Sequence, residues 1–181
     1  MTASTTLIAC SHGTRSARAA GLVTAAVEAV AAKLPGTRVI EMFVDVQQPE
    51  LAGALPGVTG PVVVLPLFLS RGYHVHHDIR AAVAAHRHAV LTAPLGPDPV
   101  LADLQLSRLR QAGMRGGDAV VLAASASSDQ RAVRDVSRAA RLLEHRLGTE
   151  VTVGVVGGAG VPVEEAVAAV DVDPGGAHPF S

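Results

Sequence analysis

His12 stands in a short polar run whose composition suits metal or anion chemistry. Residues 11–15 read Ser-His-Gly-Thr-Arg and lie between an apolar segment and an Ala-rich segment with helical spacing. Neutral imidazole is a ligand for cobalt, iron and nickel, and the amides at the start of a helix attract anions. A simpler reading makes His12 an ordinary loop residue, with Ser11 or Thr14 capping the helix. This run alone leaves both readings open.

A second histidine cluster follows a Val-rich segment. Residues 70–80 read Ser-Arg-Gly-Tyr-His-Val-His-His-Asp-Ile-Arg. If they are helical, His74, His77 and Asp78 share one face, whereas His76 points elsewhere, so the three histidines cannot ligate one ion together. The alternative for His76 and His77 is that both are solvated. His74 is therefore the favoured ligand of this cluster.

A carboxylate completes the candidate metal site. Glu41, Phe43 and Asp45 alternate along a predicted strand and so share one side of it, with Asp45 nearest the carboxyl end. Two histidines and Asp45 would leave coordination positions open for an incoming ligand, as a metal-transfer site requires. A closed structural zinc site usually needs thiolates, which the single cysteine, Cys10, cannot supply. The other reading of Asp45 is a cap at the end of the strand.

The elements that position these residues alternate between strand and helix. Strands are predicted at residues 6–10, 38–46, 61–65 and 89–92, and helices at 17–34, 50–55, 75–86 and 100–112. Such alternation predicts right-handed βαβ crossovers and a mostly parallel sheet, with ligand sites beyond the carboxyl ends of the strands. We therefore predict an α/β fold of Rossmann-like, parallel-sheet lobes with both histidine motifs at strand ends.

The second half repeats the first in a degenerate form. The opening Leu7–Gly13 matches 122–127, which lays His12 on Ala126, and a later match lays Asp45 on Gly157. The polar groups are lost in the copy, and residues 171–181 turn to Gly, Pro and Asp without a counterpart of 62–80. We predict a site-bearing lobe over residues 1–113 and an incomplete second lobe over residues 114–181.

Composition narrows the class of protein. The 49% hydrophobic content includes one Tyr, three Phe and no Trp, so the core must be aliphatic. Fifteen Lys plus Arg against 16 Asp plus Glu give a net charge of −1, and no basic patch with aromatics offers a nucleic-acid surface. The longest apolar run, residues 62–69, is too short to span a membrane. We expect a soluble, cytoplasmic protein with neither nucleic-acid nor membrane partners.

Three spaced motifs resemble those of the sirohydrochlorin chelatases. The family's His-Gly-Ser is similar to residues 12–14, its Phe-x-Glu-x-x-x-Pro to residues 43–49, and its Gly-x-His-x-x-x-Asp-Ile to residues 72–79. The resemblance covers the first 95 residues, and the degenerate repeat looks like the second lobe of longer members. Thr14 replaces the family's serine, and Asp45 replaces its glutamate, which shortens the reach of the acid by one methylene.

This resemblance implies a lyase that inserts Co²⁺ or Fe²⁺, with Ni²⁺ as a further candidate, into a sirohydrochlorin-type tetrapyrrole for cobalamin or siroheme biosynthesis. It implies that His12 and His74 hold the metal and assist loss of the pyrrole protons, with Asp45 as a further ligand. No organic cofactor is expected. The segments expected to bind the macrocycle contain Ser11, Gly13, Arg15, Arg71 and Gly72. The other reading of the two arginines is ordinary surface charge.

Two other functions remain open from the sequence. A non-catalytic carrier of metal or tetrapyrrole is favoured by the unfinished second lobe. Phosphoryl transfer with His12 as nucleophile would use the same helix start, but it leaves residues 72–79 and the repeat unexplained. A homodimer, and a chain that continues beyond Ser181, are likewise open alternatives.

Overall fold

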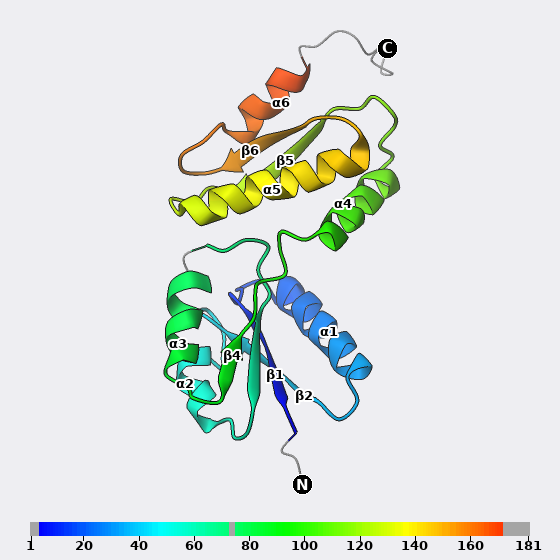
Figure 1. Cartoon of the computed structure of the whole chain (residues 1–181). Helices are drawn as coiled ribbons and strands as arrows, with labels where there is room; N and C mark the ends of the chain where they lie inside the picture. The colour runs from blue at the N-terminus through cyan, green and yellow to red at the C-terminus, as the bar shows by residue number, and fades with distance from the viewer. Residues whose placement is uncertain (1–3, 73–74, 172–181) are drawn as a thin grey trace. The chain divides into compact units, whose positions relative to one another are not determined.

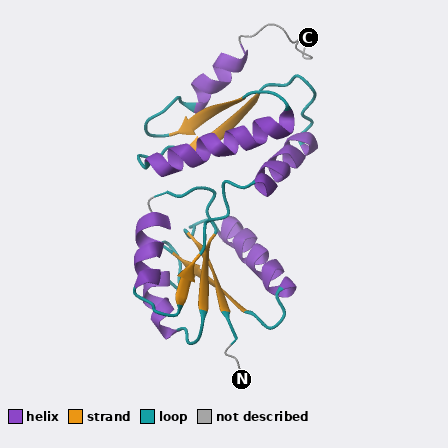
Figure 2. Cartoon of the chain, viewed as in Figure 1, coloured by secondary structure: helices purple, strands orange, loops and turns teal. Residues whose placement is uncertain are grey.

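The computed structural model describes residues 4–72 and 75–171 and has two compact units. The first unit covers Met1–Leu95 and the second Gly96–Ser181. Strands and helices alternate in both, as Figure 2 shows, and all strand pairs are parallel. The predicted α/β class with parallel sheets is confirmed.

The sheet of the first unit places three strand ends at one edge. Its strands, in the spatial order β2-β1-β3-β4, are β1 (Thr6–Ser11), β2 (Arg38–Phe43), β3 (Val62–Pro66) and β4 (Ala89–Leu91). Ser11 lies opposite Phe43, and Cys10 opposite Pro66, so β1, β2 and β3 end almost level. The chain leaves the sheet there, which is where α/β proteins hold their ligands.

Helices cover both faces of this sheet (Figure 1). They are α1 (Ala17–Lys33), α2 (Leu51–Ala54), the 3₁₀ turn Leu55–Gly57, the π-helical turn Val75–Ile79 and α3 (Arg80–Ala84). The chain moves from β1 to β2 in one direction and on to β3 in the other, so right-handed crossovers place α1 opposite α2 and α3. The helix predicted over 75–86 thus begins as a π turn and ends at Ala84.

An aliphatic core lies between the sheet and the α2–α3 side. Ile8 and Cys10 of β1 point to this face, where they pack with Val64, Leu55 and Ile79, all fully buried. The opposite face, toward α1, carries Leu7, Ala9 and Ser11, because side chains alternate along a strand. That second face holds the polar residues considered below.

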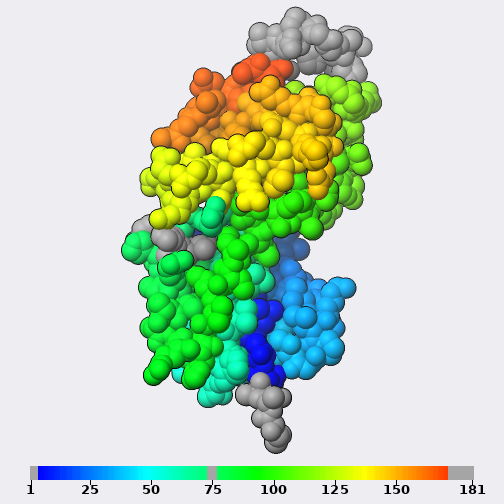
Figure 3. All heavy atoms as spheres, in the orientation of Figure 1, coloured from blue at the N-terminus to red at the C-terminus, as the bar shows by residue number. Residues whose placement is uncertain are grey.

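The second unit is a smaller α/β layer. It consists of α4 (Pro99–Gln111), β5 (Val120–Ser125), α5 (Gln130–Leu147), β6 (Val151–Val156) and α6 (Val163–Asp171). β5 and β6 form a two-stranded sheet over a core that includes Val120 and Leu143. Residues of α5, yellow in Figure 3, cover much of the visible face of this unit. None of the helices in the described ranges is long and apolar enough to cross a membrane.

The compact units divide at residues 95–96, whereas the lobe boundary predicted from the repeat lies near Gly113. The reason is α4, which packs against α5 and contributes Leu106 and Leu109 to the second core. Asp103 of α4 also forms an ion pair with Arg146 of α5. A lobe boundary at Gly113, as a division between the two repeats, stays a prediction.

The internal repeat is visible in matching turns. Thr14 Oγ1 accepts a hydrogen bond from the backbone N–H of Ser16, the N-cap of α1, over 3.1 Å. Ser127 Oγ accepts one from the N–H of Asp129, the N-cap of α5, also over 3.1 Å. The segment β1–α1–β2–α2 is therefore repeated by β5–α5–β6–α6, and within the described residues the second copy has two strands against four in the first.

These turns correct the alignment made from the sequence. Because Thr14 corresponds to Ser127, His12 corresponds to Ser125 and Gly13 to Ala126. The sequence match, led by the shared serine, had placed His12 on Ala126. The capping geometry shifts this part of the alignment by one residue.

Candidate functional site

His12 and Asp45 are held together by the backbone at the carboxyl edge of the sheet. His12 follows β1 directly, and pairing with the β2 side continues past the strands. The N–H of Val44 donates to the carbonyl of Ser11 over 2.9 Å, and the N–H of Asp45 donates to the carbonyl of His12 over 3.1 Å. Both His12 and Asp45 are exposed, so their side chains are accessible to a ligand at this edge.

Close contact between the two loops requires a glycine at position 13. Gly13 has φ +90°, and a Cβ there would lie 2.3 Å from the carbonyl oxygen of Asp45. The N–H of Thr14 then donates to Oε1 of Gln47 over 2.8 Å, which ties the loops at a second point. Gln47 was not among the residues singled out in the sequence, where only its place between Asp45 and Pro49 marks it.

Asp45 uses one carboxylate oxygen to shape its own loop. Its Oδ1 accepts a hydrogen bond from the N–H of Val46 over 2.7 Å, and its carbonyl accepts one from Gln47 N–H over 2.6 Å. The predicted role as a strand-end cap is thus part of the structure. Oδ2 is the oxygen that could still bind a cation.

The loop after β3 approaches the same edge. The N–H of Leu67 donates to the carbonyl of Cys10 over 2.8 Å, so this loop begins beside β1. Arg71 is exposed and Gly72 half-buried, while His77 and Asp78 are exposed on the π-helical turn. His74, the second predicted metal ligand, lies outside the described residues, as does the face it was predicted to share.

A complete metal-ligand set is not found within the described part of the chain. No group of three or more His, Cys, Asp or Glu side chains there could hold an ion, so His12 and Asp45 supply two donors at most. Cys10 is not a third, because burial raises the pKa of its thiol to about 12 and keeps it protonated. A third donor would have to come from elsewhere, and His74 is the predicted one.

The edge is also suited to anions. α1 begins one residue after Ser16, whose Oγ accepts from Ala19 N–H over 3.3 Å, and its first turn holds no acidic residue. Arg15 is exposed just before it. The helix start and this guanidinium both favour a negatively charged ligand.

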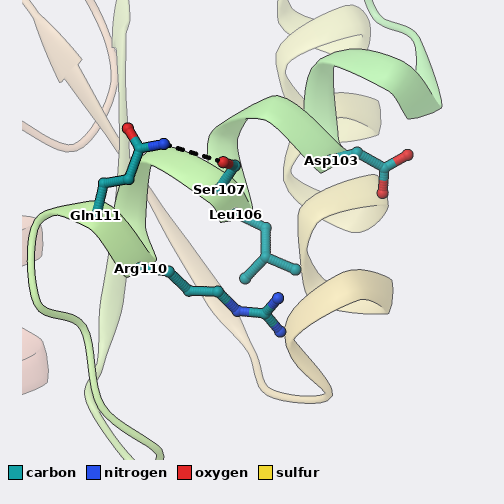
Figure 4. Close-up of a pocket in the computed structure, with 5 residues that line it drawn as sticks. All are labelled: Asp103, Leu106, Ser107, Arg110 and Gln111. Carbon is teal, nitrogen blue, oxygen red and sulfur yellow. Dashed lines mark hydrogen bonds between the residues drawn. The ribbon is translucent and has the colours of Figure 1, made fainter.

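Other hollows among the described residues lie away from this edge, and two of them show what the second unit offers. An open hollow of about 510 Å³ runs along α4 and is lined by Asp103, Leu106, Ser107, Arg110 and Gln111 (Figure 4). A cavity of about 200 Å³ lies at the carboxyl ends of β5 and β6 and is lined by Val, Ala, Gly and Ser residues, including Ser125. Since Ser125 is the counterpart of His12, the second unit has a hydroxyl where the first has an imidazole.

Comparison with known protein families shows the family to which this chain belongs. A profile of the CbiX family matches residues 6–112, more than half of the chain. The chain belongs to the CbiX family. Comparison with curated protein sequences finds no match.

Solved structures similar to this chain show its fold. SirB from Bacillus subtilis with Fe³⁺ has a TM-score of 0.80 at 23% identity, over 95% of this chain and 73% of that one. SirB from Bacillus subtilis subspecies spizizenii in complex with cobalt has a TM-score of 0.69 at 21% identity, over 94% and 84%. A multi-domain Deinococcus radiodurans protein with structural similarity to chelatases has a TM-score of 0.68 at 26% identity, over 93% and 42%. This CbiX-family chain therefore has the chelatase fold.

Proposed function

We propose that the chain is a sirohydrochlorin chelatase that inserts Co²⁺ or Fe²⁺ into the macrocycle. The observation that carries this is the pairing of His12 and Asp45 on joined loops at the carboxyl edge of a CbiX-family sheet. Structures of SirB, which share the fold, contain Fe³⁺ or cobalt. Metal is the substrate here, so a loosely held ion suits the task better than a closed site.

His12 and His74 are the proposed metal-holding residues, with Asp45 Oδ2 as a further donor. Imidazole and one carboxylate oxygen are ligands that cobalt and iron accept, and a small donor set leaves positions open for pyrrole nitrogens. The carboxylate also lowers the electrostatic cost of bringing a dication to this edge.

The tetrapyrrole carboxylates are proposed to bind beside the metal. Arg15, the start of α1 and Arg71 place positive charge or amide donors around the strand ends. Ser11, Gly13 and Gly72 belong to the backbone segments that the macrocycle would approach. Arginine–carboxylate contacts fix orientation as well as affinity, which metal insertion needs.

Insertion replaces two pyrrole protons by one dication, so the site must accept protons. Imidazole titrates near neutrality and suits this role, but a nitrogen bound to metal cannot accept a proton at the same time. Two histidines divide these tasks better than one.

The test is an insertion assay on the purified full chain, with sirohydrochlorin and Co²⁺, or Fe²⁺ without oxygen, followed by absorbance. We expect acceleration over the spontaneous reaction, and a loss of roughly 100-fold in His12→Ala and His74→Ala. His88→Ala is the matched control, because exposed His88 precedes β4 at the opposite edge of the sheet. Asp45→Asn keeps an oxygen for Val46 N–H and isolates the effect of the charge.

A carrier is the second candidate, favoured by the two-stranded sheet of the second unit. It would bind metal or macrocycle without turnover. Wild-type protein that binds Co²⁺ or sirohydrochlorin but leaves the insertion rate at its spontaneous value would replace the chelatase proposal by this one.

A further inference from the structure

Two buried oxygen atoms in the first unit lack a hydrogen-bond partner within the described residues. They are Oγ of Ser11, whose side chain is 8% exposed, and Oε1 of Glu41. An unpaired buried hydroxyl or carboxylate oxygen costs about 1–3 kcal/mol or more, so proteins rarely keep one without a reason.

The two residues lie on the same face of the sheet, beneath α1. Ala9 pairs with Glu41, and Ser11 pairs with Phe43, so Ser11 and Glu41 are diagonal neighbours. Strand spacing and rise put their Cα atoms about 8 Å apart. The other two side chains of this four-residue block are the methyl group of Ala9, opposite Glu41, and the buried ring of Phe43, opposite Ser11.

Glu41 continues this polar line to the surface. Its Oε2 accepts a hydrogen bond from Oγ1 of Thr24 over 2.8 Å, and Thr24 is exposed on α1. The line therefore starts at Ser11, directly before His12, and ends where water reaches α1. One or two water molecules could bridge Ser11 and Glu41, since both offer unpaired oxygens.

The second unit shows that the fold does not need these groups. Phe43 N–H donates to Pro49, and Val155 N–H donates to Val161, so Phe43 corresponds to Val155. By the strand registers, Ser11 then corresponds to Ala124 and Glu41 to Val153. The same layer is built there from apolar side chains.

The hydroxyl that corresponds to that of Thr24 also has a different partner. Ser137 of α5 donates its hydroxyl to the carbonyl of Val133 in its own helix over 3.1 Å. The polar line is thus present in the unit that carries His12 and replaced in the unit that carries Ser125.

We propose that Ser11 and Glu41 form a proton relay that serves metal insertion; this rests on the proposed chelatase function. A proton released from a pyrrole nitrogen enters at the Ser11 hydroxyl, which passes its own proton through bridging water to the Glu41 carboxylate. The resulting carboxylic acid returns the proton to water beside Thr24 and is ionised again. Ser11 ends each cycle unchanged, and no oxidant or reductant is needed.

The experiment is a double-mutant cycle on the full chain. Ser11→Ala, Glu41→Gln and the double variant are compared with wild type in the insertion assay, in H₂O and D₂O. Ser137→Ala is the matched control in the second unit. Ser11→Ala with Glu41→Val, which installs the residue types of the second unit, controls for folding and should keep the melting temperature of the wild type.

We expect each single variant to lower kcat by about tenfold or more, with KM for metal and macrocycle unchanged. Members of one relay should not add, so the double variant should be no slower than the slower single variant, and the solvent isotope effect should change in all three. Ser137→Ala should match wild type.

Variants within twofold of wild-type kcat, or losses that multiply in the double variant, overturn the relay while the chelatase proposal stands. A wild type that does not accelerate insertion removes the proposed function, and the relay falls with it. The two failures are therefore distinguishable.

Discussion

At the scale of single residues, the two copies of the repeat solve one steric problem in opposite ways. In the first unit, Gly13 faces Val46, which has φ +64°. In the second, the corresponding pair is Ala126 and Gly158, with φ +67° at the glycine, and a Cβ on Gly158 would lie 2.7 Å from that of Ala126. The closed loops have room for one side chain, and either side can carry it.

This exchange predicts a compensating pair of substitutions. Gly13→Ala should lower the free energy of unfolding by about 2 kcal/mol, because a Cβ there meets the Asp45 carbonyl and φ is left-handed. Adding Val46→Gly should recover about 1 kcal/mol, because it removes the Val46 Cβ that would lie 3.3 Å from the new one and lets the loop with the Asp45 carbonyl move away. Urea denaturation of both singles and the double measures the coupling; strictly additive effects would contradict the steric account.

The candidate site residues are only partly predictable from the sequence at this scale. The spacing of residues was sufficient to select His12 and Asp45, and the loops bring their backbones within hydrogen-bond distance. Gln47, Ser11 Oγ and Glu41 Oε1 were not predictable in their roles, because partnership and burial depend on neighbours distant in sequence. Alternation along the strand predicted that Glu41 and Phe43 share one face, but it could not predict which helix covers that face.

At the scale of elements, α5 organises the second unit. Asp129 caps its start by accepting from Arg131 N–H over 2.8 Å, and Gly148 ends it with φ +73°. One face of α5 packs in the core through Ala140 and Leu143. Near its end, Arg146 reaches Asp103 of α4.

The Asp103–Arg146 pair predicts a pH-dependent contribution to stability. The hydrogen bond from Arg146 lowers the pKa of Asp103. The pair therefore stabilises the folded state fully above the ordinary pKa of an aspartate. This stabilisation is lost as the pH falls through the lowered pKa. Asp103→Asn should melt slightly below wild type at neutral pH, and the difference should vanish in strong acid. Because the pair is solvent-exposed, roughly 1 M salt should also reduce the difference in melting temperature between Asp103→Asn and wild type. A difference that persists in acid would assign the effect to packing.

At the scale of the whole molecule, two cores stabilise two units. The first centres on residues such as Leu55 at 1% exposure, and the second on Leu143 at 2%. The family match ends at residue 112, yet α4, its last helix, packs with the second core. The end of the family match and the boundary between the compact units thus lie at different points of the chain.

Separate cores predict separate responses to cavity-forming substitutions. Leu55→Ala and Leu143→Ala each remove the same atoms from a buried site and should each cost about 2–5 kcal/mol. Hydrogen exchange followed by mass spectrometry should show faster exchange over residues 4–95 in the first variant and over residues 96–171 in the second. Acceleration of both regions by either variant would mean that the units unfold together.

The sequence alone determined the α/β class, the order of strands and helices, and the repeat, and it selected His12 and Asp45 as candidate site residues. These follow from local periodicity, breakers and residue chemistry, which act over a few positions. Tertiary structure decided the rest: where the units divide, which loop residues correspond in the repeat, and which polar atoms are buried without partners. Those properties depend on contacts between segments far apart in the chain. A shift of one residue, or one added Cβ, changes which atoms come into contact there.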